Sequence, residues 1–163
     1  MKWLLIFVLV LAAPVIIAAS IGALLPRTHV VSRSVVLPKP PEEVWAVVSG
    51  PPTWRAEIRS YQELPAHNGH RMWKETDSHG QTITYEETES VPPSRMVTRI
   101  ADRKLPFGGT WTIDIAPSGT GSSVKITENG AVYNPVYRFM SRFVIGQNAT
   151  IDAYLKSLKK KLI

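Results

Sequence analysis

Six short stretches rich in β-branched and aromatic residues, separated by turn residues, constrain the fold of this chain more than any other feature. They span residues 58–64, 71–76, 81–90, 95–101, 110–116 and 123–130. Asn-Gly, Pro-Pro, Gly-Gly and Ser-Gly pairs fall between them, and such pairs close tight turns between antiparallel strands. A further stretch of this kind spans His29–Leu37. The sequence therefore predicts a curved antiparallel sheet of about seven strands.

Residues 134–162 carry the pattern of one long amphipathic helix. Asn134 is a good helix cap, and Pro135 suits the first helical position. Steps of four and three separate a row of mostly apolar residues, which are Val136, Met140, Phe143, Gln147, Ile151, Tyr154, Leu158 and Leu162. We expect this helix to lie across the sheet in an α+β fold. A short helix is expected to open at Lys39–Glu43, with one more helical turn over residues 53–57.

The amino-terminal segment is apolar enough to matter for location. Residues 3–25 contain no charged side chain, and as a helix they would span roughly 35 Å, against about 30 Å for the hydrocarbon core of a bilayer. A cleaved signal is the alternative, with small residues at Ala18-Ala19-Ser20, but the apolar run continues beyond them. We predict that residues 1–27 form a transmembrane anchor (or signal segment) and that residues 28–163 form one domain. The short amino-terminal tail favours a single-pass membrane protein whose domain is extracytoplasmic.

Several kinds of chemistry receive no support from the sequence. The absence of cysteine excludes disulfides and thiolate catalysis. The four histidines do not show metal-ligand spacing, and no Gly-x-Ser-x-Gly motif is present. Much of the net charge of +6 comes from Lys156 and Lys159–Lys161. These lysines suit the carbonyl end of a helix or anionic headgroups. We expect no metal, no cofactor and no nucleic acid.

Several motifs resemble those of a known superfamily. They are Pro-Pro-Glu-Glu-Val-Trp at 40–45, Trp-Lys-Glu-Thr at 73–76, Phe-Gly-Gly-Thr-Trp at 107–111, Thr-Glu-Asn-Gly at 127–130, Tyr-Asn-Pro at 133–135 and Arg-Phe-Met-Ser-Arg-Phe at 138–143. Together with the order of elements, they resemble the START-related helix-grip superfamily over residues 28–162. That superfamily includes birch-pollen-allergen-like proteins and the polyketide cyclase/dehydrase and lipid-transport group. The resemblance implies a helix-grip fold; members bind lipids, sterols, quinones or aromatic polyketides, and a minority are enzymes.

Strand alternation points to one unusual carboxylate. Trp111 and Ile113 share one face of their strand, and Ile126 and Glu128 share one face of the next. Glu128 therefore lies on the apolar side and needs a partner, for which Arg99 and Arg138 are the candidates. Three roles remain open for it: an anchor for the polar end of a ligand, a general acid or base, and a structural ion pair.

The expected ligand site lies between the sheet and the long helix. Gln147 faces this space from mid-helix, as a pocket residue or as one bonded to nearby backbone. The candidate ligand-binding residues are Trp73, Tyr85, Arg99, Trp111, Ile113, Ile126, Glu128, Tyr137, Met140, Phe143 and Gln147. The preferred function is non-catalytic binding or transport of a hydrophobic small molecule or lipid at a membrane. The alternatives are a cyclase- or hydrolase-type enzyme that uses Glu128, and a protein-interaction or chaperone-like domain without a cavity.

Overall fold

The computed structural model of the protein describes residues 2–163, apart from the side chains of residues 4–6, 8, 9 and 11. The elements are, in order, α1 (Lys2–Leu24), β1 (Thr28–Leu37), α2 (Pro41–Val48), β2 (Ile58–His67), β3 (His70–Asp77), β4 (Thr82–Val91), β5 (Arg95–Ile100), β6 (Phe107–Ser118), β7 (Gly121–Val132), α3 (Pro135–Met140), the π-helical segment η1 (Ser141–Ile145) and α4 (Ala149–Leu162). The predicted order of the seven strands, with a short helix after the first strand and helical structure after the last, is confirmed. Residues 53–57 form turns instead of the expected helical turn.

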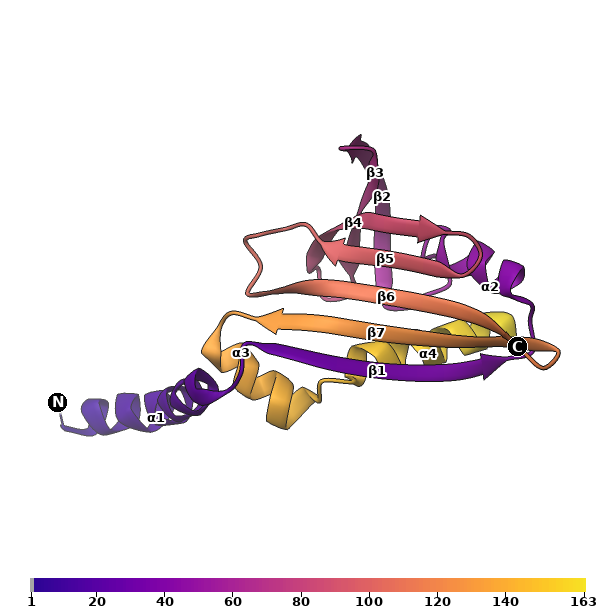
Figure 1. The fold of residues 1–163 in the computed structure, drawn as a ribbon. Helices are drawn as coiled ribbons and strands as arrows, with labels where there is room; N and C mark the ends of the chain where they lie inside the picture. The colour runs from indigo at the N-terminus through magenta and orange to yellow at the C-terminus, as the bar shows by residue number, and fades with distance from the viewer. Residues whose placement is uncertain (1) are drawn as a thin grey trace.

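The seven strands form one antiparallel sheet in the order β1-β7-β6-β5-β4-β3-β2. Figure 1 shows β1, β7 and β6 broadside, whereas β2 and β3 stand steeply to them, so the sheet is strongly curved. Helix α4 lies behind β7 and β1 in this view, on the concave side of the sheet. The first strand, β1, lies at one edge of the sheet and pairs with the last strand, β7. The other strands pair with their neighbours along the sequence.

Helix α2 begins as the sequence indicates. Pro41 occupies the first helical position, and Glu42 and Glu43 lie in the first turn, where carboxylates stabilise the positive end of the helix. Val44 and Val48 are buried against the core. The chain then turns at Ser49, whose hydroxyl donates to the Trp45 carbonyl at 2.7 Å.

The carboxy-terminal helix is not continuous, contrary to the expectation from its apolar periodicity. Asn134 caps α3, with its side-chain oxygen accepting from the amides of Val136 and Tyr137. The backbone then widens into η1 and stops at Gly146, whose φ of 87° lies in the left-handed region that glycine tolerates best. Helix α4 starts only at Ala149. The helical periodicity on the two sides of Gly146 therefore does not define a single face.

Helix α1 packs against α3 at its carboxy-terminal end. Gly22 makes this possible, because a Cβ atom there would overlap the backbone of Pro135. Toward its amino-terminal end, α1 extends away from the sheet (Figure 1). Within the described residues, none of the helices combines the length and the apolar character that crossing a membrane requires. The transmembrane anchor stays a prediction from the sequence.

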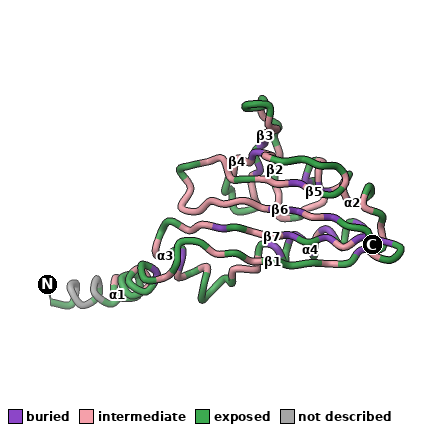
Figure 2. The backbone as a smooth tube through the Cα atoms, in the orientation of Figure 1, coloured by how far each residue is buried: buried purple, intermediate pink, exposed green. Residues whose placement is uncertain are grey.

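The packed core occupies one end of the space between the sheet and α4. Fully buried residues include Leu37 of β1, Val124 and Ile126 of β7, and Ile151 and Leu158 of α4. Figure 2 shows the buried segments gathered on β6, β7 and α4 toward the carboxy-terminus. The other end of the same space holds the candidate site.

Candidate functional site

The inward-facing pairs of β6 and β7 change character along the strands. Ile113 lies opposite Ile126 in the packed core, and the next inward pair is Trp111 with Glu128. The following pair is Gly109 with Gly130, which adds no side chain of its own, and the imidazole of His29 lies against Gly130. A cavity of about 810 Å³ opens there, bounded by β2–β7, η1 and Tyr154 of α4.

A buried ion pair stands in the wall of this cavity. Arg55 Nη1 donates to Glu75 Oε2 at 2.9 Å, and Arg55 Nε donates to Glu57 Oε1 at 2.9 Å. Trp73 Nε1 donates to the other oxygen of Glu75 at 2.9 Å. Burial alone would lower the pKa of Arg55, but Glu75 and Glu57 outweigh it and raise that pKa. Both ends of the pair are satisfied by protein partners.

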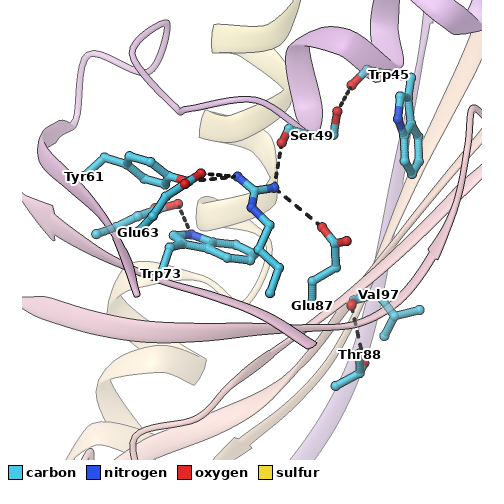
Figure 3. A network of polar contacts seen from close by, with 10 residues as sticks. Trp45, Ser49, Tyr61, Glu63, Trp73, Glu87, Thr88 and Val97 are labelled. Atoms are coloured by element: carbon cyan, nitrogen blue, oxygen red, sulfur yellow. Dashed lines mark hydrogen bonds and ion pairs between the residues drawn. The ribbon is translucent and has the colours of Figure 1, made fainter. Parts of the chain in front are cut away.

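A second arginine is held by the network in Figure 3. Arg71 donates to the Ser49 carbonyl at 2.7 Å and to the Tyr61 hydroxyl at 2.8 Å. Its guanidinium lies 5.2 Å from the centre of the Trp73 ring, and Glu63 and Glu87 lie within ion-pair distance, at 3.4 Å and 3.7 Å. These contacts tie β2 and β3 to the end of α2 and fix the orientation of the Trp73 indole in the cavity wall.

Glu128 lies in the wall opposite, on β7. Its Oε1 is 3.2 Å from His29 Nε2, and its Oε2 accepts from Trp111 Nε1 at 2.9 Å. His29 of β1 lies opposite Gly130 in the register, and a Cβ at Gly130 would come within 2.3 Å of the imidazole. Glycine at this position is therefore required for the histidine to reach the carboxylate.

Aromatic side chains line the rest of the cavity. Tyr154 makes edge contacts with Trp54 and Trp111, at centroid distances of 5.1 Å and 5.6 Å, and Trp73 stacks on Tyr85 at 5.6 Å. Burial raises the pKa of Tyr85 and Tyr154 well above the ordinary value, and the Glu75 carboxylate adds to the increase. Both phenols therefore remain uncharged hydrogen-bond donors at neutral pH.

The structure brings most of the candidate ligand-binding residues together. The ones that line the cavity are Trp73, Tyr85, Arg99, Trp111, Ile113, Glu128, Tyr137 and Gln147. Ile126 is instead fully buried in the packed core. Met140 and Phe143 are 37% and 59% exposed and do not line the cavity, because the break at Gly146 separates their face from that of α4. Whether the lining residues bind a ligand stays a prediction.

The prediction that Arg99 or Arg138 pairs with Glu128 is wrong. Arg99 pairs with Glu86 at 2.6 Å, and it stands at the cavity rim with 51% of its side chain exposed. Hydrogen bonds from His70 and then Arg99 lower the pKa of Glu86. Arg138 donates to backbone carbonyls. The arginines were predicted because they carry the opposite charge. The observed partners, His29 and Trp111, lie beside Glu128 because β1 and β6 pair with β7.

Sequence reasoning missed the Arg55–Glu75 pair. Glu75 carries the same signal as Glu128, because it shares a strand face with the apolar Trp73. Arg55 lies in an irregular loop between α2 and β2, where no periodicity predicts the direction of a side chain. Tyr154 fitted the apolar row of the helix, but nothing in that row indicated contact with a cavity.

Comparison with known proteins gives the family. Residues 28–162 match the family described as polyketide cyclase / dehydrase and lipid transport. The chain belongs to this family. A search of curated proteins finds no match. The predicted membership of the START-related helix-grip superfamily is confirmed.

Solved structures of the same fold include a synthase, an ARO/CYC protein and a protein from Thermus thermophilus. A protein from Thermus thermophilus has 19% identity and a TM-score of 0.66, with 82% of this chain and 97% of that one covered. Norcoclaurine synthase from Thalictrum flavum has 13% identity and a TM-score of 0.62, with 82% and 86% covered. The di-domain ARO/CYC of the BE-7585A biosynthetic pathway has 14% identity and a TM-score of 0.68, with 88% and 52% covered. At these identities the similarity shows the fold alone.

Proposed function

We propose that this protein binds a hydrophobic small molecule or lipid in the large cavity without transforming it. The observation that carries the proposal is the cavity itself, about 810 Å³ between the sheet and α4, walled by Trp, Tyr and Ile side chains. Ligand sites typically enclose about 300–1,000 Å³ and present mainly apolar walls with a few polar groups. Family membership supports the binding of a hydrophobic ligand, without naming the ligand.

The charged groups of the cavity favour binding over catalysis. Both oxygens of Glu75 and both oxygens of Glu128 already have protein partners within 3.2 Å. A general acid or base has to reach the reacting proton of its substrate, and these carboxylates would first have to give up an indole or a cation. Their observed partners suit a rigid wall that orients aromatic rings.

A second candidate function rests on the contact between His29 and Glu128. Both side chains line the cavity, and a histidine next to a carboxylate is an arrangement that can move a proton. Substitution of Glu128 by Gln distinguishes the two functions. A binding protein is expected to keep its ligand in this variant, because the amide oxygen can still accept from Trp111. A proton-transfer enzyme is expected to bind and lose turnover.

The alternative of an interaction domain required a filled space between sheet and helix. The large cavity argues against it. The apolar surface on α3 and η1, with Tyr137, Phe143 and Val144 more than half exposed, instead borders the cavity, because Tyr137 and Ile145 also line it. This surface supports entry of an apolar ligand past η1.

The test is a fluorescence titration of the full-length chain with the uncharged dye N-phenyl-1-naphthylamine. Native mass spectrometry of protein from its host extract would identify any co-purifying molecule. We expect saturable, one-to-one dye binding, displaced by that molecule and weakened by Ile83→Phe, which fills the cavity wall. Val36→Phe is the matched control, since it adds the same ring at a side chain that is exposed and outside the lining. An absence of dye binding, together with a bare protein mass, contradicts the proposal.

We further propose that binding takes place at a membrane, with the domain on the extracytoplasmic side. The support is the uncharged run of residues 3–25 and its position beside the exposed apolar residues of α3 and η1. Alkaline carbonate extraction of cell membranes should leave the full-length chain in the pellet, and protease added to intact spheroplasts should degrade the domain. Release of the chain into the supernatant would overturn the tether, and protection from protease would overturn the orientation.

A further inference from the structure

A second cavity, of about 190 Å³, lies where the end of α1 meets β1 and η1. Its charged lining consists of Arg27, Arg138 and Arg142, with His29 beside them, and no Asp or Glu forms part of its wall. A cavity lined by three arginines and, among the described residues, by no carboxylate has a positive potential, which favours an anion.

Arg138 is the clearest sign that a negative group is missing. Its side chain is buried, at 7% exposed. Nη1 donates to the Leu25 carbonyl at 2.9 Å and Nη2 to the Tyr133 carbonyl at 3.1 Å. Nε is buried and has no partner among the described residues. The carbonyls at the end of α1 supply only partial negative charge.

Among the residues that the structure describes, Arg27 and Arg142 do not have acidic partners either. Within residues 2–163, the arginines that form ion pairs are Arg33, Arg55, Arg71, Arg95 and Arg99. No ion pair involves Arg27, Arg138 or Arg142 in this part of the chain. Arg142 donates only to Gln147 Oε1, at 3.1 Å. Burying an unpaired charge is costly, so the guanidinium of Arg138 would be stabilised by an anion bound from outside the chain.

The small cavity adjoins the large one. His29, Val132, Ser141 and Gln147 belong to the walls of both. Glu128 lines the large cavity and not the small one, and it is held by His29 and Trp111. One molecule can therefore place an apolar body in the large cavity and a negative group among the arginines.

We infer that the ligand is an anionic amphiphile, whose phosphate or carboxylate group binds Arg27, Arg138 and Arg142 while its apolar part fills the large cavity. The inference rests on the proposed function and narrows its ligand class. It also assigns a role to Gln147, which stands between the two cavities and holds Arg142 in place.

A matched pair of dyes tests the inference. 1-Anilinonaphthalene-8-sulfonate and N-phenyl-1-naphthylamine share one apolar body and differ by a sulfonate. The full-length chain is titrated with each, against a blank that contains the same solubilising agent. We expect the sulfonate to bind about tenfold more tightly than the neutral dye, as fits one or two charge-assisted hydrogen bonds.

The variants separate this site from the net positive charge of the chain. Arg138→Gln would also remove hydrogen bonds to two backbone carbonyls, so the test uses the exposed pair Arg27→Gln/Arg142→Gln. This double variant should lose about tenfold in affinity for the sulfonate and nothing for the neutral dye. Arg59→Gln/Arg103→Gln is the control, because it makes the same change in charge at exposed positions outside both cavities.

Each other outcome overturns a stated part. Equal affinity for the two dyes, or equal losses in the two double variants, overturns the anionic site and leaves hydrophobic binding intact. If neither dye binds, both the inference and the proposed function fall. Calorimetry with inorganic phosphate alone separates the sources of the anion. Millimolar or weaker binding fits a group attached to an apolar body, whereas micromolar binding would identify a free-anion site and overturn the amphiphile.

Discussion

The two ends of the space between the sheet and α4 are built on the same strands and filled in opposite ways. At one end, Ile115 and Val124 pair across β6 and β7 and pack under Leu158. At the other, the paired positions are Gly109, which lines the large cavity, and Gly130, against which the His29 imidazole lies. Six residues along β6 therefore separate a close-packed core from a cavity, with the Ile113–Ile126 and Trp111–Glu128 pairs between them.

The comparison shows how one fold can be stable and hollow at once. The packed end supplies apolar burial, which is the main favourable contribution to folding. The open end keeps its shape through polar ties, Arg55–Glu75, Arg71–Ser49 and His29–Glu128, each of which has a bond of 3.2 Å or less. Such ties fix side-chain direction without filling volume. Stability and cavity shape should therefore respond to different substitutions.

The largest expected effect is at the packed end. Leu158 is completely buried, and Leu158→Ala should lower the free energy of unfolding by about 3 kcal/mol through lost burial and a new void. Chemical denaturation measures this, and the dye affinity of the folded fraction should stay unchanged. A loss below about 1 kcal/mol, or a change in dye affinity, would mean that the two ends are not separate.

Enlarging a residue should give opposite results at the two ends. Val124 is fully buried, so Val124→Phe should overpack the core and cost about 1–3 kcal/mol of stability. Ile83→Phe points its extra volume at the open cavity and should cost less than about 1 kcal/mol, while it weakens binding of N-phenyl-1-naphthylamine. Equal destabilisation by the two variants would indicate that the cavity end is as closely packed as the core.

The fold could be predicted from the sequence more fully than the site. Turn residues delimit the strands, and alternation predicts the facing rows of β6 and β7, including the inward Glu128. Contacts across the sheet could not be predicted in the same way. His29 reaches Glu128 because β1 pairs with β7, two strands that are 99 residues apart at this contact. Arg55 comes from a loop, where no repeating pattern predicts the direction of a side chain.

The break in the closing helix was missed for a related reason. Apolar spacing continues across Gly146, and this spacing does not report backbone conformation. Gly146→Ala tests the break. In a continuous helix alanine would stabilise by about 0.5–1 kcal/mol, but at a φ of 87° it should instead destabilise by about 1 kcal/mol. Gly146→Asn should destabilise to a similar extent, because with a ψ of 132° this backbone lies outside the αL region that asparagine tolerates. A gain in stability with alanine would contradict the break.

The last expected effect is absent at neutral pH and appears only at high pH, as a loss of stability that originates at the aromatic side chains of the cavity wall. Burial raises the pKa of Tyr154 and Tyr85 above the unfolded value of about 10. Below that pH both states are protonated and the stabilisation is complete. Above it the unfolded phenols ionise first, so the free energy of unfolding falls, by at most about 1.4 kcal/mol per pH unit for each group.

Denaturation curves between about pH 9 and pH 11 measure this slope, and absorbance of the phenolate follows ionisation directly. Tyr154→Phe should reduce the slope, since it removes one of the two buried phenols. Tyr85→Phe, on the cavity wall, should reduce it to a similar extent in the ligand-free protein. If bound ligand covers the Tyr85 hydroxyl, saturation with it should slow the ionisation of that phenol further. A slope unchanged in both variants would place the alkaline sensitivity outside the cavity boundary.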